Sequence, residues 1–248
     1  MHHENSNRFL TAFNDIEAEL TDRMGRHKPG GFAQLLNMLR RHDAQIRLHY
    51  DTLRQFAKLR NAIVHSMRED FIIAEPHDEV VAEIERIRDQ LAQPPIIADY
   101  MTQHPYHVPR HTTIAEVIAT FRARNFQRCP IIGQEGICGL ITAKSITTWI
   151  GSLLAHPDQD GKHLPLERIM GRTVDDVLPF CSSREYAIVP RNASIADAVY
   201  LFRRSIEHGR YLQSLLVTAE GTPQSALVGI VAPSDLPRLF TEDIDIED

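Results

Sequence analysis

The sequence predicts an α+β protein in which an N-terminal helical domain precedes a pair of β-α-β-β-α units. Three observations support this fold class. Apolar residues recur at helical spacing up to about Gln93, Pro94-Pro95 then ends that pattern, and a segment that begins at Val108 returns at Val189. The expected boundaries are 1–93 for the helical domain, 94–155 for the first unit, 156–166 for a polar linker and 167–248 for the second unit.

Four apolar stripes occupy the first segment, with the three- and four-residue steps of helix faces that pack on a core. Breaks at 28–31 and 74–76 contain glycine or proline, which interrupt helices. We therefore expect four helices. Their predicted buried faces are Phe9, Phe13, Ile16 and Leu20; Phe32, Leu35, Leu36 and Leu39; Leu48, Leu53, Phe56, Leu59, Ile63 and Val64; and Val80, Val81, Ile84, Ile87 and Leu91.

The second half of the chain contains a duplication. The segment VPRHTTIAE at 108–116 matches VPRNASIAD at 189–197, and the match continues to Phe121 and Phe202. A single β-α-β-β-α unit leaves one face of its sheet poorly covered. Two copies can share a core, so the repeat predicts a stacked pair, here named copy one and copy two.

Each copy predicts the same order of elements. After a strand and a proline turn, a helix begins with Thr113 or Ser194 as its N-cap. Glu116 and Asp197, three residues later, can complete a capping box in each copy. The remaining expected elements are strands at 129–132, 137–141, 215–218 and 226–231 and a final helix from Lys144 and from Ser234.

Composition narrows the class of protein. A net charge of −6 and a pI near 6.1 do not suggest a sequence-independent nucleic-acid binder. The cysteines Cys129, Cys138 and Cys181 are odd in number and form no Cys-x-x-Cys pair, which favours a reducing compartment over a disulfide framework or a zinc knuckle. The polar start has no signal core and no apolar run could span a bilayer, so we expect a cytoplasmic protein.

Three short motifs accompany the duplication: DYMT at 99–102, CPII at 129–132 and GLIT at 139–142. Together they resemble the CBS domain over roughly residues 94–240. The resemblance implies a tandem CBS pair, or Bateman module, with a regulatory role, which commonly forms a homodimer through its helices. It also implies an adenine nucleotide ligand, such as AMP, ADP, ATP or S-adenosylmethionine.

In this family, a Gly-x-x-Thr-x-x-Asp stretch opens the last helix of each unit. A helix N-terminus and a hydroxyl suit a phosphate, and a carboxylate can accept both ribose hydroxyls. Copy one reads Gly139, Thr142 and Ser145. It therefore keeps the phosphate hydroxyl and lacks the ribose carboxylate.

Copy two reads Gly229, Ala232 and Asp235, with Ser234 nearby. It keeps the carboxylate, so Asp235 is the preferred ribose-binding candidate. The competing interpretation is structural: the carboxylate stabilises a helix start, and the nearby cations are solvated surface. The cations that could bind a phosphate are Arg110, Arg128, Lys144, Arg191 and Arg210.

The third apolar stripe carries RNAIVH at 60–65. Arg60-Asn61 followed by His65 resembles the signature of HEPN domains, whose active members cleave RNA without a metal. Asn61 and His65 are four residues apart and share a helix face. A histidine can move a proton and an arginine can hold a phosphate, which suits attack by a ribose 2′-hydroxyl. Alternatively, these side chains hold helices together in a non-catalytic domain.

Two further features receive structural interpretations. His104, His107 and His111 lie close together in the sequence but have no cysteine or carboxylate partner nearby, so no metal site is expected. Trp149 is expected in the core or in a dimer contact.

The sequence thus favours a sensor, in which a bound nucleotide changes the packing of the pair and acts on the helical domain or a partner. The first alternative is a nucleotide-regulated, metal-independent RNase that uses Arg60, Asn61 and His65, with RNA as its partner. The second alternative is a structural dimer whose clefts bind nothing. No membrane partner is expected.

Overall fold

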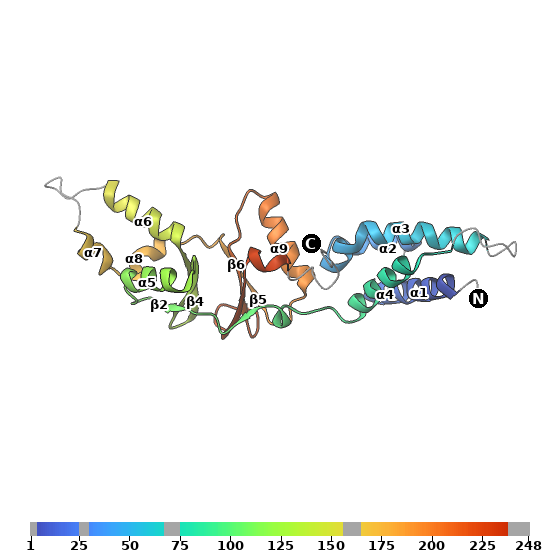
Figure 1. Ribbon diagram of the computed structural model, residues 1–248, viewed down its shortest axis with the longest axis horizontal. Helices are drawn as coiled ribbons and strands as arrows, with labels where there is room; N and C mark the ends of the chain where they lie inside the picture. Colours follow the sequence, from blue (N-terminus) through green and yellow to red (C-terminus); the bar gives the residue numbers. More distant parts are fainter. Residues whose placement is uncertain (1–3, 25–29, 67–74, 156–164, 238–248) are drawn as a thin grey trace. The chain divides into compact units, whose positions relative to one another are not determined.

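The computed structural model describes residues 4–24, 30–66, 75–155 and 165–237, with only the backbone of residues 65 and 66. The chain divides into two compact parts, one formed by residues 1–95 and 194–200 and the other by residues 96–193 and 201–248. Helices form the N-terminal region, and two β-sheets with helices follow it (Figure 1). The predicted α+β class is confirmed. In the described parts of the chain, no helix is long and apolar enough to cross a membrane.

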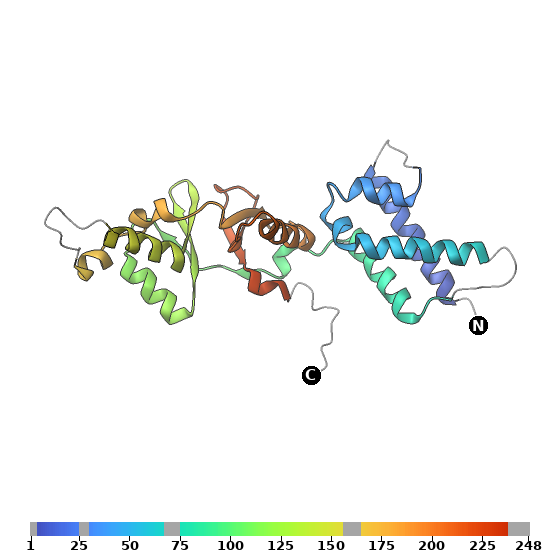
Figure 2. The same ribbon diagram turned by 90° about the horizontal axis from the view of Figure 1, so that it is seen from above.

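The N-terminal region forms the four predicted helices. They are α1 (Glu4–Met24), α2 (Phe32–Leu39), α3 (Ala44–Ser66) and α4 (Asp78–Ala92). Figures 1 and 2 show α4 running beside α1. The apolar stripes meet in one core, in which Phe9, Leu36, Ile63 and Ile84 have no exposed surface.

One predicted face is wrong at its start. Leu48 is 39% exposed, whereas Ile46 is fully buried. A helix repeats every 3.6 residues, so the seven-residue step from Ile46 to Leu53 returns to the same face. The five-residue step from Leu48 does not. The other predicted faces are buried or half-buried.

Copy one continues beyond its predicted end. Its described elements are the 3-10 turn η2 (Ile97–Asp99), β1 (Thr102–Gln103), β2 (Val108–Pro109), α5 (Ile114–Arg124), β3 (Arg128–Gly133), β4 (Gly136–Thr142) and α6 (Ala143–Ala155), followed by α7 (Leu166–Met170), α8 (Val174–Val177) and η3 (Leu178–Phe180). Ile169 and Val174 are buried in the same cluster as Ile131 and Trp149. The segment after α6 therefore packs on the core of copy one. Most of the predicted linker, residues 156–164, lies outside the described residues.

Copy two repeats the order of elements. Its described elements are β5 (Tyr186–Pro190), α9 (Ile195–Glu207), β6 (Ser214–Thr218), β7 (Leu227–Val231) and the 3-10 turn η4 (Pro233–Asp235). The predicted strands are confirmed in both copies to within one residue or two at each end. The local patterns that predict them, short β-branched runs bounded by turns, act over a few residues only.

The two sheets share a topology, and one strand from copy one joins the sheet of copy two. In copy one, the order is β2-β3-β4, with β2 parallel to β3 and β3 antiparallel to β4. In copy two, the order is β1-β7-β6-β5. The strand β1, which belongs to copy one in the sequence, pairs antiparallel with β7, so that Thr102 lies opposite Ile230. The chain thereby ties the two copies together.

Both predicted capping boxes are confirmed. The hydroxyl of Thr113 accepts the N–H of Glu116 at 3.3 Å, and the hydroxyl of Ser194 accepts the N–H of Asp197 at 3.1 Å. Each carboxylate accepts the N–H of its cap residue in return. These bonds satisfy N–H groups that have no partner inside the helix.

The two copies meet across an apolar layer. Its buried centre contains Ile137, Leu140 and Leu216, with side chains of β5 and β7 packed around them. Tyr186 lies in this layer, and burial raises the pKa of its phenol. The layer is the shared core that the duplication predicted.

Candidate ligand site

Thr142 and Ser145, the copy-one residues of the predicted phosphate motif, hydrogen-bond to each other at the start of α6. The Thr142 Oγ1 atom accepts the Ser145 N–H at 3.0 Å, and the Ser145 Oγ atom accepts the Thr142 N–H at 2.9 Å. Both residues are buried, with 3% and 2% exposure. Their hydroxyl groups therefore satisfy backbone donors at the helix start, as N-caps do.

The glycines of the two motifs lie against neighbouring side chains. A Cβ atom on Gly139 would be 3.0 Å from the Leu178 Cδ1 atom of η3. A Cβ atom on Gly229 would be 2.1 Å from the Met101 Sδ atom, which lies beside β1. Both glycines thus allow close packing of segments on the sheets.

Asp235 stands at the end of η4, where its Oδ2 atom accepts the N–H of Ala232 at 2.8 Å. The residue is half-buried, and its neighbour Ser234 is exposed. A carboxylate has two oxygen atoms with about four acceptor positions. Asp235 can therefore hold the backbone and still accept hydrogen bonds from a ligand.

Two cations of copy one reach copy two. Arg128 Nη1 donates a hydrogen bond to the carbonyl oxygen of Gln213, the residue just before β6, and Lys144 Nζ lies 3.1 Å from Glu185 Oε1. The N–H of Gln213 in turn donates to the carbonyl oxygen of Glu185 at 2.6 Å. The Arg128–Gln213 and Lys144–Glu185 contacts therefore join copy one to copy two at neighbouring points, and the Gln213–Glu185 hydrogen bond connects them within copy two.

The strand register places both helix starts at this end of the pair. Arg128 lies opposite Thr142 on the neighbouring strand, so α6 begins beside Arg128. In copy two, Leu215 lies opposite Val231, so Asp235 follows the end of the sheet at which β6 begins. The structure thus gathers the two halves of the split motif at one end of the pair.

Arg110 and Arg191 lie at the other end. Arg110 follows β2, in which Pro109 is paired with Ile132 near the end of β3. The N–H of Arg191 donates to the carbonyl oxygen of Thr218, the last residue of β6. A strand of five or six residues spans roughly 17–20 Å. The structure therefore separates both arginines from the motif residues by about the length of a strand.

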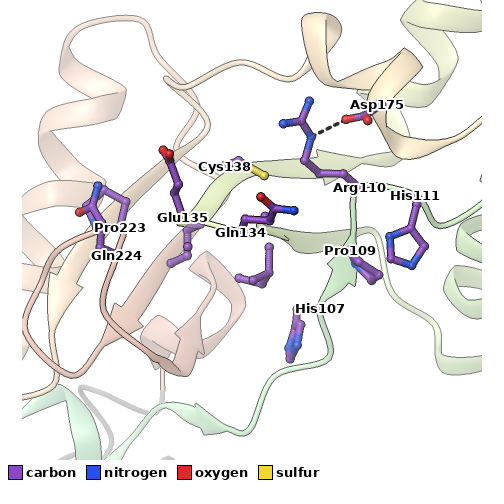
Figure 3. A pocket seen from close by; sticks show the side chains of 14 residues that line it. His107, Pro109, Arg110, His111, Gln134, Glu135, Cys138, Asp175, Pro223 and Gln224 are labelled. Carbon is purple, nitrogen blue, oxygen red and sulfur yellow. Dashed lines mark hydrogen bonds and ion pairs between the residues drawn. The ribbon is translucent and has the colours of Figure 1, made fainter.

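A cavity of about 1150 Å³ opens at the Arg110 end, beside the β3–β4 hairpin. Figure 3 shows Arg110 turned toward Asp175, with which it forms an ion pair. His107 and Gln224 lie well apart from that pair in the same view. The labelled polar side chains do not converge on a common point, so the lining specifies no particular ligand.

Sequence reasoning missed Glu185 and Gln213. Both lie outside the family-like motifs, directly before the first strand residues of β5 and β6. Glu185 is buried, with 8% exposure, which is unusual for a carboxylate. A charged residue in front of an apolar strand was the one signal in the sequence that could have found it.

In the helical region, Arg60 and Asn61 line a cavity of about 510 Å³ together with Phe13 and Glu17. The Arg60 Nε atom is buried and has no hydrogen-bond partner among the described residues, while Nη1 lies 3.3 Å from the Asn61 Oδ1 atom. The side chain of His65 lies outside the described residues. The structure therefore places two of the three predicted catalytic residues at one cavity.

The histidines and cysteines considered in the sequence form neither a metal site nor a reactive thiol in the described residues. His104, His107 and His111 are exposed, and no three His, Cys, Asp or Glu residues within the described ranges are grouped to hold a metal ion. The three cysteines are free thiols, and burial raises the pKa of Cys129 to about 12. Such a thiol stays protonated and is a poor nucleophile at neutral pH.

The strand order, the duplication and the pairing of β1 with the sheet of copy two define a paired β-α-β-β-α module. Residues 97–152, which run from η2 to α6 of copy one, match the family model of the CBS domain. The predicted fold of a helical region followed by a pair of CBS-type units is therefore confirmed. The resemblance of the helical region to HEPN domains stays a prediction.

Solved structures of CBS-domain proteins are similar to the second half of the chain. The acetoin utilization protein AcuB from Vibrio cholerae is 16% identical over 58% of this chain and 88% of its own, with a TM-score of 0.44. The CBS pair of protein MJ0100, in complex with 5′-methylthioadenosine and S-adenosyl-L-methionine, is 16% identical over 61% and 99%, with a TM-score of 0.42. The CBS domain of a bacterial CNNM/CorC family Mg²⁺ transporter, in complex with ATP, is 18% identical over 60% and 89%, with a TM-score of 0.40. No curated protein matches the sequence.

Proposed function

We propose that the CBS-type pair is a regulatory module that binds an adenine nucleotide at the end of the sheets where Arg128 meets Gln213. The observation that carries this proposal is the gathering of the split motif at that end. Copy one contributes the cations Arg128 and Lys144, and copy two contributes the carboxylate of Asp235. Neither copy needs the complete motif if one ligand contacts both.

The roles follow from the chemistry of each group. The second oxygen of Asp235 is suited to the ribose hydroxyls, since ionised carboxylates accept several hydrogen bonds. Arg128 and Lys144 are suited to the phosphates, because charge-assisted hydrogen bonds are the strongest that side chains make. Thr142 and Ser145 do not need to contact the ligand in this arrangement. Their reciprocal hydrogen bonds hold the start of α6, where Lys144 lies, in place.

A regulatory output needs a ligand that distinguishes two states of the protein. A nucleotide that contacts both copies favours the state in which they are correctly spaced. We propose that this change is relayed to the helical region or to a partner, and that the protein acts in the cytoplasm as a homodimer.

Thermal unfolding and calorimetric titration with AMP, ADP, ATP and S-adenosylmethionine test the proposal. A ligand at about one hundred times its Kd should stabilise the protein by about 2.7 kcal/mol. Arg128→Gln and Asp235→Asn should each weaken binding about tenfold or more. Arg110→Gln, which removes a cation at the opposite end, is the matched control and should leave binding unchanged.

Two results would overturn the proposal. The absence of any shift in Tm at millimolar nucleotide would favour a structural dimer with non-binding clefts. Equal losses in Arg110→Gln and Arg128→Gln would show that the ligand does not bind at the end where Arg128 contacts Gln213.

A second candidate function, a metal-independent RNase, is favoured by one observation. The buried Arg60 Nε atom lacks a partner within the described residues, and Arg60 and Asn61 line the same cavity. Purified protein and labelled single-stranded RNA test it beside Arg60→Ala and His65→Ala. Cleavage lost in both variants supports it, whereas cleavage that survives both is contamination.

A further inference from the structure

Lys144, one of the two cations at the proposed nucleotide site, already has a protein carboxylate as its partner. Its Nζ atom lies 3.1 Å from Glu185 Oε1, and the two side chains differ greatly in exposure, 74% for the lysine and 10% for the glutamate. Solvent therefore reaches the cation but hardly reaches the carboxylate. A ligand can approach Lys144 without first displacing other side chains.

The charge at the start of α6 is positive. Lys144 is the second residue of the helix, near the positive end of the helix dipole, and the first turn of α6 has no acidic residue. The helices α5 and α9 instead carry Glu116 and Asp197 in their first turns. Arg128 adds a second positive charge beside the start of α6. The carboxylate that pairs with Lys144 comes from copy two and belongs to Glu185.

We infer that Glu185 acts as an internal competitor for the ligand phosphate, so that the site accepts phosphate-bearing adenine nucleotides and rejects adenosine and S-adenosylmethionine. This inference rests on the proposed function. A phosphate that binds Arg128 and Lys144 replaces the carboxylate of Glu185 as the counter-charge of Lys144. Adenosine has no charge to offer the cations. S-adenosylmethionine carries one carboxylate but also an ammonium and a sulfonium group, and the cations repel its net positive charge.

Replacing Glu185 by a phosphate as the partner of Lys144 costs free energy, and this cost lowers the affinity for the nucleotide. A carboxylate that is 90% buried is destabilised when its cation turns to another anion, because solvent cannot replace the lost charge. Replacing Glu185 by glutamine removes both this cost and the repulsion between carboxylate and phosphate. The affinity for phosphorylated nucleotides should therefore rise in the variant, and the affinity for adenosine should not.

The same exchange alters a contact between the copies. The Lys144–Glu185 ion pair joins α6 of copy one to the start of β5 in copy two, and the carbonyl oxygen of Glu185 accepts the N–H of Gln213. A bound phosphate loosens the first of these contacts. The ligand-free and ligand-bound states then differ in their contacts between copies, which is the physical requirement for a ligand-driven switch.

Calorimetric titration of the full chain with ATP, AMP, adenosine and S-adenosylmethionine tests the inference. Glu185→Gln should lower the Kd for ATP about tenfold and leave adenosine unchanged. Glu135→Gln is the matched control, because it removes the same charge from an exposed residue at the hairpin end. Its Kd for ATP should stay within about twofold of wild type, since exposed charges at that distance are screened.

The outcomes separate the inference from the proposed function. If neither wild type nor variants bind any of the four ligands, the proposed function fails and the inference falls with it. If wild type binds ATP and Glu185→Gln binds it equally or more weakly, the inference alone is overturned. An equal gain for adenosine or S-adenosylmethionine would overturn it as well. If Glu185→Gln fails to fold, Lys144→Met takes its place as the test. This variant should weaken ATP binding about tenfold and leave adenosine binding unchanged. Unchanged ATP binding would overturn the inference.

Discussion

The N–H of Ile137 donates a hydrogen bond of 2.8 Å to the carbonyl oxygen of Pro223, and this bond holds the β3–β4 hairpin of copy one against the β6–β7 loop of copy two. The preceding residue, Gly136, has a φ of +107°. A Cβ atom there would lie 2.1 Å from the same oxygen of Pro223. The copies can approach at this end only because Gly136 has no side chain.

Gly136→Ala should therefore lower the free energy of unfolding by at least about 2 kcal/mol, from backbone strain and from the clash with Pro223. Denaturant titration measures the loss. Gly151→Ala is the control, because a Cβ atom there meets nothing within 4 Å and the residue lies inside α6. It should stabilise the protein by roughly 0.5–1 kcal/mol. Similar effects in both variants would contradict this account of the hairpin contact.

Ser145→Ala should destabilise the protein in the absence of ligand by about 1–3 kcal/mol, because the buried N–H of Thr142 loses its acceptor. Thr148→Ala removes an exposed hydroxyl that bonds the carbonyl oxygen of Lys144 in the same helix. That change should stay within about 0.5 kcal/mol. Stability unaffected by Ser145→Ala would mean that its hydroxyl serves a ligand and not the helix start.

The two capping boxes should contribute equally to the two copies. Thr113→Ala and Ser194→Ala should each cost about 1 kcal/mol, since each leaves the N–H of the third helical residue without its acceptor. Thr11→Ala is the control: its hydroxyl is exposed within α1 and bonds only the carbonyl oxygen of Asn7 among the described contacts. A cost in Thr11→Ala as large as in the cap variants would refute the assignment.

Acid should destabilise the helical region through His49. Burial and the nearby Arg86 lower the pKa of His49 to about 4, although Gln90 opposes the shift by hydrogen bonding. The unfolded chain takes up a proton near pH 6.5, and the folded chain resists it until about pH 4. The free energy of unfolding should therefore fall as the pH drops from 6.5 to 4, by at most about 3 kcal/mol.

His49→Gln removes this titration while keeping a polar side chain near Gln90. Calorimetric melting at pH 7 and pH 5 should show a smaller loss of Tm in the variant than in the wild type. His42→Gln is the control, because His42 is exposed. An equal pH dependence in wild type and His49→Gln would exclude His49 as the source of the acid sensitivity.

Local patterns predicted most elements of this protein. The helix faces around Phe9 and Ile84, the caps at Thr113 and Ser194, and the strands of both copies are confirmed because each depends on residues within a few positions of one another. The prediction is wrong at Leu48 because the buried face of α3 includes Ile46, two residues earlier, in place of Leu48.

The candidate site was only partly predictable for the opposite reason. The motif residues Thr142 and Asp235 were found from spacing, but their hydrogen bonds to the helix start and to Ala232 were not. Spacing likewise gave no sign that Arg110 and Arg191 lie a strand length away from them. A side chain's partners depend on which distant segments meet, and a motif contains no information about that.

The sequence by itself determined that the second half is a pair of repeated units, because the duplication is written in consecutive residues. Only the tertiary structure decided that β1 joins the sheet of copy two, that the segment from Leu166 to Phe180 packs on copy one, and that Glu185 faces Lys144. These arrangements follow from burying the apolar surface and pairing the charges of segments far apart in the chain. Their free energy exists only when those segments are brought together.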